Sequence, residues 1–294
     1  MKSGFVAIIG KPNAGKSTLL NSLLDKKIAI TTSKAQTTRN SILGILNDDN
    51  LQIVFIDTPG IHEATTYLGS YMNKEAYASA NGADLIYYVI DAKKGLNNQD
   101  KKVLDKLFSY DIPIFALINK IDELSNDKLI ERCNYCANHY PFKEIIPISA
   151  LKKDNFDELL NTTKEYLNDG ILYYDSNTSE ISTREFKISE IIREKIILNA
   201  YDEVPHLTAV KIDEIKETEN KIFIEASIIV NKQSHKGIII GKQGSMLKKI
   251  NMQASKDLKA LLNKKVILSL YVKVEEDWLN KENKLFDLGY FNEW

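Results

Sequence analysis

Near its start this 294-residue chain reads Gly10-Lys11-Pro12-Asn13-Ala14-Gly15-Lys16-Ser17-Thr18, which matches the phosphate-binding pattern G-x-x-x-x-G-K-[ST]. Apolar residues 5–9 before it predict a buried strand, and residues 17–24 after it predict a helix with one apolar face. In that context backbone N–H groups wrap the α- and β-phosphates, Lys16 reaches the β- and γ-phosphates, and the Ser17 hydroxyl ligates Mg²⁺. The stretch therefore predicts a nucleoside triphosphate site between a strand and a helix.

Three further motifs follow, each directly after an apolar stretch that predicts a strand. After residues 51–56 comes Asp57-Thr58-Pro59-Gly60, whose carboxylate can hold Mg²⁺ through water and whose glycine N–H can contact the γ-phosphate. After residues 112–118 comes Asn119-Lys120-Ile121-Asp122. After residues 145–148 comes Ser149-Ala150, whose backbone N–H groups can contact the carbonyl oxygen of guanine.

Asp122 is the residue that we expect to select the base. Its two oxygens can accept hydrogen bonds from N1–H and from the exocyclic amine of guanine, a donor pair that adenine lacks. Each motif alone is a weak signal, but four in this order, each at the carboxyl end of a predicted strand, indicate a GTP-binding domain. The residues expected to bind GTP are Gly10, Lys11, Pro12, Asn13, Ala14, Gly15, Lys16, Ser17, Thr18, Asp57, Thr58, Pro59, Gly60, Ile61, Asn119, Lys120, Ile121, Asp122, Ser149 and Ala150.

The pattern of the chain changes near residue 168. Up to about residue 167, strand and helix patterns alternate, which predicts an α/β domain with a mostly parallel sheet and helices on both faces. Residues 173–180 are polar without a clear period and indicate a linker. We therefore expect a GTP-binding domain at residues 1–168, a linker at 169–183 and a smaller α+β domain at 184–294.

The predicted second domain carries the pattern of a KH RNA-binding domain. Residues 186–197 predict a helix, 207–215 and 221–230 predict two strands, and 278–288 predict a final helix. Between them, Gly237-Ile238-Ile239-Ile240-Gly241-Lys242-Gln243-Gly244 forms an apolar turn and a Gly-x-x-Gly loop before an amphipathic helix. Apolar residues then alternate with period two from 266 to 274, as in a strand. The order helix-strand-strand-helix-helix-strand-helix resembles the type II KH topology.

Charge supports RNA binding by this region. Residues 232–265 contain nine lysines and one acidic residue, Asp257, so their net charge is +8 in a chain whose total is −1. Lysines on a helix can also form only a solvated face, but basic residues beside a Gly-x-x-Gly groove supply phosphate contacts. The residues expected to contact RNA are Lys236, Gly237, Ile240, Gly241, Lys242, Gln243, Gly244, Lys248 and Lys249.

Composition points to a cytoplasmic protein. No apolar run reaches about 18 residues, and the first predicted strand starts too early to leave room for a signal peptide. The only cysteines, Cys133 and Cys136, stand near His139, but no second Cys/His pair follows to complete a zinc site. We expect two thiols on one helix.

Taken over nearly its full length, the chain resembles the Ras-like, translation-factor-related GTPases, and among them the Era family. The stretch Lys34-Ala35-Gln36-Thr37-Thr38-Arg39-Asn40 resembles the family's first switch loop, although by itself it is only a polar loop. The resemblance implies that Thr38 ligates Mg²⁺ with Ser17 and Asp57, and that Lys16, Thr38 and Gly60 serve catalysis. It also implies a monomer that binds the 3′ end of small-subunit (16S) rRNA, assists maturation of the small ribosomal subunit, and associates peripherally with the inner face of the cell membrane.

One departure concerns hydrolysis. Ile61 follows Gly60, where Ras-like enzymes commonly carry a glutamine that orients the attacking water, and isoleucine cannot hydrogen-bond to water. We expect slow intrinsic turnover that is stimulated by a partner or a cation. Asn13 resembles the asparagine with which related GTPases hold potassium, so K⁺ is a further expected cofactor. His62 is more simply explained as a solvated loop residue than as a catalytic one.

Two other functions stay open at this point. A tRNA-modification GTPase of the same superfamily would lack the KH segment that we expect at residues 237–244. A non-enzymatic RNA-binding scaffold would hold its nucleotide only as a structural element, and RNA-responsive release of phosphate would exclude it.

Overall fold

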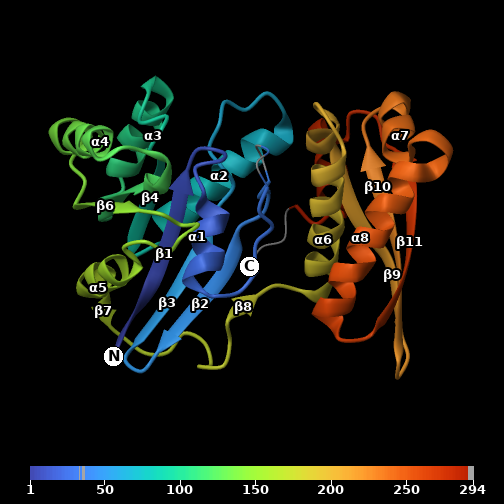
Figure 1. Cartoon of the computed structure of the whole chain (residues 1–294), viewed down its shortest axis with the longest axis horizontal. Helices are drawn as coiled ribbons and strands as arrows, with labels where there is room; N and C mark the ends of the chain where they lie inside the picture. Colours follow the sequence, from blue (N-terminus) through green and yellow to red (C-terminus); the bar gives the residue numbers. More distant parts are fainter. Residues whose placement is uncertain (33, 35–36, 291–294) are drawn as a thin grey trace. The chain divides into compact units, whose positions relative to one another are not determined.

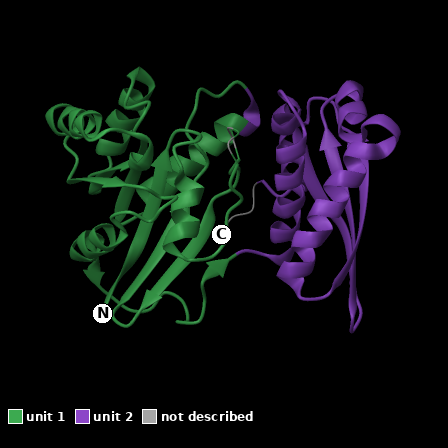
Figure 2. Ribbon diagram, viewed as in Figure 1, with its two compact units in different colours: residues 1–65, 69–181 green, residues 66–68, 182–294 purple. Residues whose placement is uncertain are grey.

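The computed structural model describes residues 1–32, 34 and 37–290, and the chain divides into two compact units (Figure 2). The first unit contains residues 1–65 and 69–181, and the second contains residues 66–68 and the chain from residue 182 onward. Most helices and strands are labelled in Figure 1.

The first unit is built on one eight-stranded sheet. Seven strands follow the order β6-β5-β4-β1-β3-β2-β8, and the eighth, β7, lies outside this order and pairs with β1. Its strands are β1 (Lys2–Gly10), β2 (Ile42–Asp48), β3 (Leu51–Asp57), β4 (Leu85–Asp91), β5 (Ile114–Asn119), β6 (Glu144–Ile148), β7 (Asn168–Asp169) and β8 (Glu180–Ile181). β1, β3, β4, β5 and β6 are parallel, whereas β2, β7 and β8 pair antiparallel to their neighbours. The predicted mostly parallel α/β sheet is confirmed.

Helices cover both faces of this sheet. The helices are α1 (Lys16–Leu23), α2 (Tyr67–Asn81), α3 (Asn98–Phe108), α4 (Asn126–His139) and α5 (Phe156–Tyr166), with a 3₁₀ turn η1 (Ile121–Glu123). Neighbouring residues of β4 contact the helices on opposite faces of the sheet. Tyr88 packs in a core with α2, α3 and α4, whereas the Tyr87 hydroxyl forms a hydrogen bond with Thr163 of α5. All seven residues of β4 are buried, as expected for a central parallel strand.

The topology places a binding crevice at the end of β1. From β1 the chain crosses to β3 on one side and, later, to β4 on the other, so the strand order reverses there. In open α/β sheets ligands bind outside the carboxyl ends of the strands at such a switch point. The loop between β1 and α1, residues 11–15, lies there.

The segment expected as a linker includes residues that belong to the first sheet. β7 pairs with β1, and β8 pairs with β2 through Gly44 and Leu43. Buried Gln52 holds the chain between them, because its Oε1 accepts hydrogen bonds from the N–H groups of Tyr173 (2.7 Å) and Tyr174 (3.1 Å). The change of unit falls after Ile181.

The second unit is a three-stranded sheet covered by helices, as expected of a type II KH fold. β10 (Lys221–Val230) lies in the middle, antiparallel to β9 (Thr208–Glu217) and parallel to β11 (Lys265–Val274). Its core joins alternate strand residues to α6 (Arg184–Asn199), α7 (Gln233–Ile240) and α8 (Ser245–Leu262). The alternating residues Val266, Leu268, Leu270, Val272 and Val274 all pack in or against this core, which confirms the predicted facing of β11.

Two local predictions in this unit were wrong. The expected apolar turn at residues 237–240 is the second half of helix α7, which buries Ile239 in the core. The expected single helix at 278–288 is broken into η4 (Trp278–Asn280) and α9 (Glu282–Asp287), because Lys281 between them is extended. A 3₁₀ turn η2 (Val204–Leu207) precedes β9. Across the described residues no helix has both the length and the apolar character to span a membrane.

Candidate nucleotide site and nucleic-acid interface

The phosphate-binding loop takes a form that its glycines make possible. Gly15, directly before α1, has φ +101°, and a Cβ there would stand 2.2 Å from Nδ2 of Asn119. Gly10 has φ +152°, and its Cβ would stand 2.5 Å from the carbonyl oxygen of Val89. Both positions combine a left-handed backbone with a close neighbour, so a side chain at either one would distort the loop.

Lys16 and Asp57 form the charged centre of the site. Lys16 Nζ donates hydrogen bonds to the carbonyl oxygens of Gly10 (3.1 Å) and Lys11 (3.0 Å). Burial, opposed in part by the Asp57 carboxylate, lowers the pKa of Lys16 to about 8. Burial also raises the pKa of Asp57 to about 6, against the opposing effects of Lys16, Ser17 and Thr38. Both shifts mean that the folded protein holds charges out of water where charged phosphates and a metal would compensate them.

The expected magnesium ligands lie together. Ser17 Oγ donates to Oδ2 of Asp57 at 2.6 Å and lies 2.8 Å from Oγ1 of Thr38, which is 3.4 Å from the same carboxylate oxygen. Oδ1 of Asp57 is buried and accepts no hydrogen bond from the part of the chain that the structure describes. Three clustered oxygens with one such carboxylate atom fit the hard cation Mg²⁺. Of the expected switch loop, Ala35 and Gln36 lie outside the described residues.

The Asp-Thr-Pro-Gly motif brings Gly60 against the phosphate-binding loop. A Cβ at Gly60 would stand 2.7 Å from the backbone nitrogen of Pro12, so only glycine fits there. The Thr58 hydroxyl donates to the carbonyl oxygen of Ile8 (2.8 Å) within the core. The Ile61 side chain packs in the hydrophobic cluster beneath α2, and its N–H donates to the carbonyl oxygen of Gly10 at 3.2 Å. Ile61 therefore contributes to the site through its backbone.

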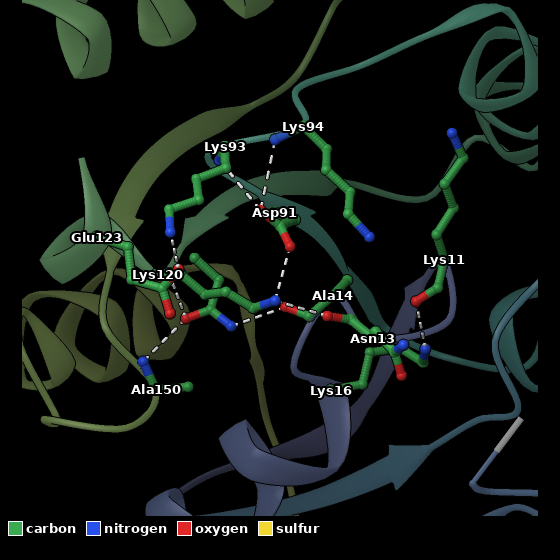
Figure 3. A network of polar contacts seen from close by, with 11 residues as sticks. Lys11, Asn13, Ala14, Lys16, Asp91, Lys93, Lys94, Lys120, Glu123 and Ala150 are labelled. Carbon is green, nitrogen blue, oxygen red and sulfur yellow. Dashed lines mark hydrogen bonds and ion pairs between the residues drawn. The ribbon is translucent and has the colours of Figure 1, made fainter. Parts of the chain in front are cut away.

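The Asn-Lys-x-Asp motif closes over the phosphate-binding loop (Figure 3). Asn119 Nδ2 donates to the carbonyl oxygen of Ala14 (2.8 Å), and Lys120 Nζ donates to that of Asn13 (2.8 Å). Lys120 also pairs with Asp91 at 2.6 Å. These bonds join the end of β5 to the loop after β1, more than 100 residues earlier in the chain.

Asp122 is held by Ser149, whose hydroxyl donates to its Oδ1 at 2.6 Å. The predicted contact of the Ser149 and Ala150 N–H groups with the guanine carbonyl oxygen stays a prediction, and in this structure both groups bond within the protein. The Ala150 N–H donates to Oδ1 of Asn119 (2.9 Å), and the Ser149 N–H points to the carbonyl oxygen of Asp154 (3.4 Å). Both N–H groups are therefore used to join loops of the protein, which positions Asn119 and Asp122.

Sequence reasoning missed several residues that shape this site. Asp91 is the last residue of the apolar strand β4, a position like those that revealed the other motifs, but no known motif follows it. Asn97 and Asp100 were also missed: each accepts a hydrogen bond from Nζ of the predicted Lys11 at 2.5 Å, which ties the phosphate-binding loop to the start of α3. Residues 30–32 line the phosphate cavity with Thr37 and Thr38, and no local pattern indicates this.

The second unit presents the Gly-x-x-Gly loop between α7 and α8. Gly241 has φ +74°, and a Cβ there would stand 2.9 Å from the backbone nitrogen of Met246. Gly244, with φ +77°, has open space around it and directly precedes the 18-residue helix α8, which has no side-chain cap. The positive end of the α8 dipole and its first N–H groups therefore face the loop, where a phosphate would be favoured.

Exposed lysines surround this loop. Lys242, Lys248 and Lys249 are exposed, and Lys236 is half-buried on α7. By contrast, Lys264, just beyond the end of α8, pairs with Glu217 (2.6 Å), and Asp257 pairs with Lys195. Exposed lysines therefore stand directly beside the glycines, where they are accessible to a polyanion.

Comparison with known proteins agrees with both sites. The family described as 50S ribosome-binding GTPase matches residues 5–120, and the KH domain family matches residues 203–279. A crystal structure of an Aquifex aeolicus Era variant bound to GDP·AlF₄⁻ is 39% identical, with 99% of each chain covered and a TM-score of 0.95. A crystal structure of Era with MgGDPNP and nucleotides 1506–1542 of 16S ribosomal RNA is also 39% identical, with 99% of each chain covered and a TM-score of 0.96.

Proposed function

This chain belongs to the Era family, and we propose that it is a GTP-hydrolysing switch that binds the 3′ end of small-subunit rRNA and assists maturation of the small ribosomal subunit. The observation that carries the proposal is the joint presence of two complete sites: four loops that meet at the carboxyl ends of one sheet, and a lysine-flanked Gly-x-x-Gly loop in a KH fold. The relative crystallised with MgGDPNP and 16S rRNA binds both ligand classes in one chain.

Different residues of the first unit bind different parts of GTP. Lys16 supplies positive charge to the β- and γ-phosphates, the Gly60 N–H contacts the γ-phosphate, and Asp122 reads guanine. Ser17, Thr38 and Asp57 would hold Mg²⁺, which neutralises phosphate charge when it is bound. Because the buried Ile61 offers no hydrogen bond to water, intrinsic hydrolysis is slow and responds to a partner or a cation. We propose that Asn13, which lines the phosphate cavity, contributes to a K⁺ site.

RNA and nucleotide are expected to act on each other through linkage. If one nucleotide state binds RNA more tightly, RNA must favour that state by the same factor. Hydrolysis then makes release directional. We further propose a monomeric, cytoplasmic protein that also associates peripherally with the inner face of the cell membrane.

Crosslinking of the protein to cellular RNA, followed by sequencing of the bound sites, tests the proposal. We expect the reads to gather at the 3′ end of small-subunit rRNA. Enrichment of tRNA would instead support a tRNA-modification GTPase. Absence of multiple-turnover phosphate release, with or without RNA, would support a scaffold that binds nucleotide only for structure.

A further inference from the structure

Asn73, on α2, makes hydrogen bonds to the backbone of His62, shortly after the Asp-Thr-Pro-Gly motif. Its Oδ1 accepts a hydrogen bond from the N–H of His62 (3.3 Å), and its Nδ2 donates to the carbonyl oxygen of the same residue (2.7 Å). One amide side chain therefore satisfies both backbone groups of His62, as a neighbouring strand would.

The helix that carries Asn73 is firmly placed. Met72, Ala76 and Ala80 are buried on one side of α2, each no more than 2% exposed. The loop is held at its other points as well: Ile61 packs in the core and bonds to Gly10, and Nδ1 of His62 lies 2.8 Å from the carbonyl oxygen of Gly60. Asn73 thus connects a fixed helix to the segment that presents the Gly60 N–H.

The connection between Asn73 and His62 matters because the neighbouring Ile61 side chain has no hydrogen-bonding group. Donors stabilise a transition state best when they are already in place before the reaction. With isoleucine at position 61, no side chain at that position can orient water or phosphate, so the placement of the loop backbone decides how well the Gly60 N–H acts. A misplacement of about 1 Å can cost about 100-fold in rate.

We infer that Asn73 is a positioning residue for GTP hydrolysis, which holds residues 60–62 in the arrangement that the reaction requires. The inference rests on the proposed GTPase activity. Asn73 bonds to the backbone of His62 and does not line the phosphate cavity, so its effect should fall on the chemical step rather than on ground-state binding.

The test compares Asn73→Ala, which loses both hydrogen bonds, with the near-isosteric Asn73→Asp, which keeps an acceptor but sets a carboxylate oxygen against the His62 carbonyl. Asn81→Ala, an exposed asparagine at the end of the same helix, is the matched control. In single turnover at saturating GTP, we expect both Asn73 variants to lose about 10-fold or more in rate. GDP affinity should stay near that of the wild type, and the melting temperature should fall by only a few degrees, as expected for lost hydrogen bonds at one residue. The control should match the wild type in every property.

Two additional readouts separate positioning from general stability. Affinity for GDP·AlF₄⁻ relative to GDP should fall in both Asn73 variants. Amide hydrogen exchange of residues 60–66 should accelerate in Asn73→Ala but not in Asn81→Ala. Hydrolysis within twofold of the wild type in both variants would overturn the inference, and so would a loss of rate matched by an equal loss of GDP affinity. A wild-type protein that hydrolyses no GTP would refute the proposed function first, and the positioning role with it.

Discussion

At the residue scale, the nucleotide site depends on a few side chains whose chemistry has no substitute. Asp122 is the clearest case, because its carboxylate offers two acceptors and Ser149 holds one of its oxygens at 2.6 Å. Glycine at position 60 is equally constrained, because Pro12 leaves no space for a Cβ. We therefore expect specificity and catalysis to depend on single atoms that residues far away in the chain hold in place.

Replacing Asp122 by asparagine should change the base preference. The substitution puts a donor opposite the donors of guanine, and a mismatched buried polar group costs about 1–3 kcal/mol, or roughly 10- to 100-fold in affinity. We expect GTP binding to fall by that factor and XTP to become the preferred nucleotide in a competition titration. Glu123→Gln, at the neighbouring half-exposed carboxylate that pairs with Lys93, is the control and should leave the preference unchanged. A variant at Asp122 that still prefers GTP would refute the role of this loop.

Nucleotide binding should exchange protons in opposite directions at low and high pH. In the free protein the pKa of Asp57 is raised to about 6 by burial, so Mg²⁺ binding at about pH 5.5 must release a proton from a largely protonated carboxyl group. The pKa of Lys16 is lowered to about 8 by burial, so phosphate binding at about pH 9 must take up a proton onto a largely neutral amine. Affinity for Mg·GDP should therefore rise through about pH 6 and fall through about pH 8. Calorimetry in two buffers of different ionisation enthalpy measures both signs, and equal heats in the two buffers at both pH values would contradict this.

At the element scale, two helices begin directly after a loop glycine and have uncapped N-termini. α1 and α8 each begin directly after a glycine in a left-handed conformation, Gly15 and Gly244, and neither helix has a side-chain cap on its first N–H groups. Uncapped N–H groups at a helix start favour phosphate. We therefore expect the start of α1 to favour the phosphates of GTP and the start of α8 to favour the RNA backbone.

Lysines beside the Gly-x-x-Gly loop should set the salt dependence of RNA binding. For Lys242→Ala and Lys248→Ala we expect weaker binding of a 3′-terminal small-subunit rRNA fragment, with the slope of log K against log salt reduced by about 0.7 for each. Lys259→Ala, farther along α8, is the control and should keep the wild-type slope. Filter-binding at several salt concentrations measures this. Unchanged slopes for the first two variants would place the RNA path elsewhere on the unit.

At the scale of the whole molecule, the two units separate nucleotide from RNA chemistry along one chain. Each has its own hydrophobic core, so damage to one binding site should leave the other intact. Any influence of RNA on hydrolysis must then appear as coupling between two otherwise independent sites.

The variant Gly244→Asp should uncouple the two activities. It adds bulk and negative charge where a phosphate would approach, and no neighbouring atom lies within 4 Å of the new Cβ, although the left-handed backbone strains the loop. We expect basal hydrolysis on the order of 10⁻⁴ to 10⁻² s⁻¹ in both proteins. RNA should change the rate of the wild type but not that of the variant. An RNA response of wild-type size in the variant would mean that the groove is not at this loop.

Sequence alone determined the features that are written in consecutive residues. The four nucleotide motifs, the parallel α/β class, the Gly-x-x-Gly loop and the facing of β11 all follow from local periodicity and from short strings whose chemistry is interpretable without neighbours. The errors also have local causes: residues 237–240 are apolar in a way that suits both a buried turn and a buried helix, and nothing in residues 278–288 indicates that Lys281 is extended.

Tertiary structure decided the contacts between residues distant in the chain. Four such contacts depend on which strands and helices become neighbours: Asn119 with Gly15, Asp91 with Lys120, Lys11 with Asp100, and Asn73 with the backbone of His62. The short strands β7 and β8 exist only because the edges of β1 and β2 are there to pair with them. Periodicity is a property of one segment, whereas pairing and burial are properties of two segments brought together, and only the folded chain specifies that second segment.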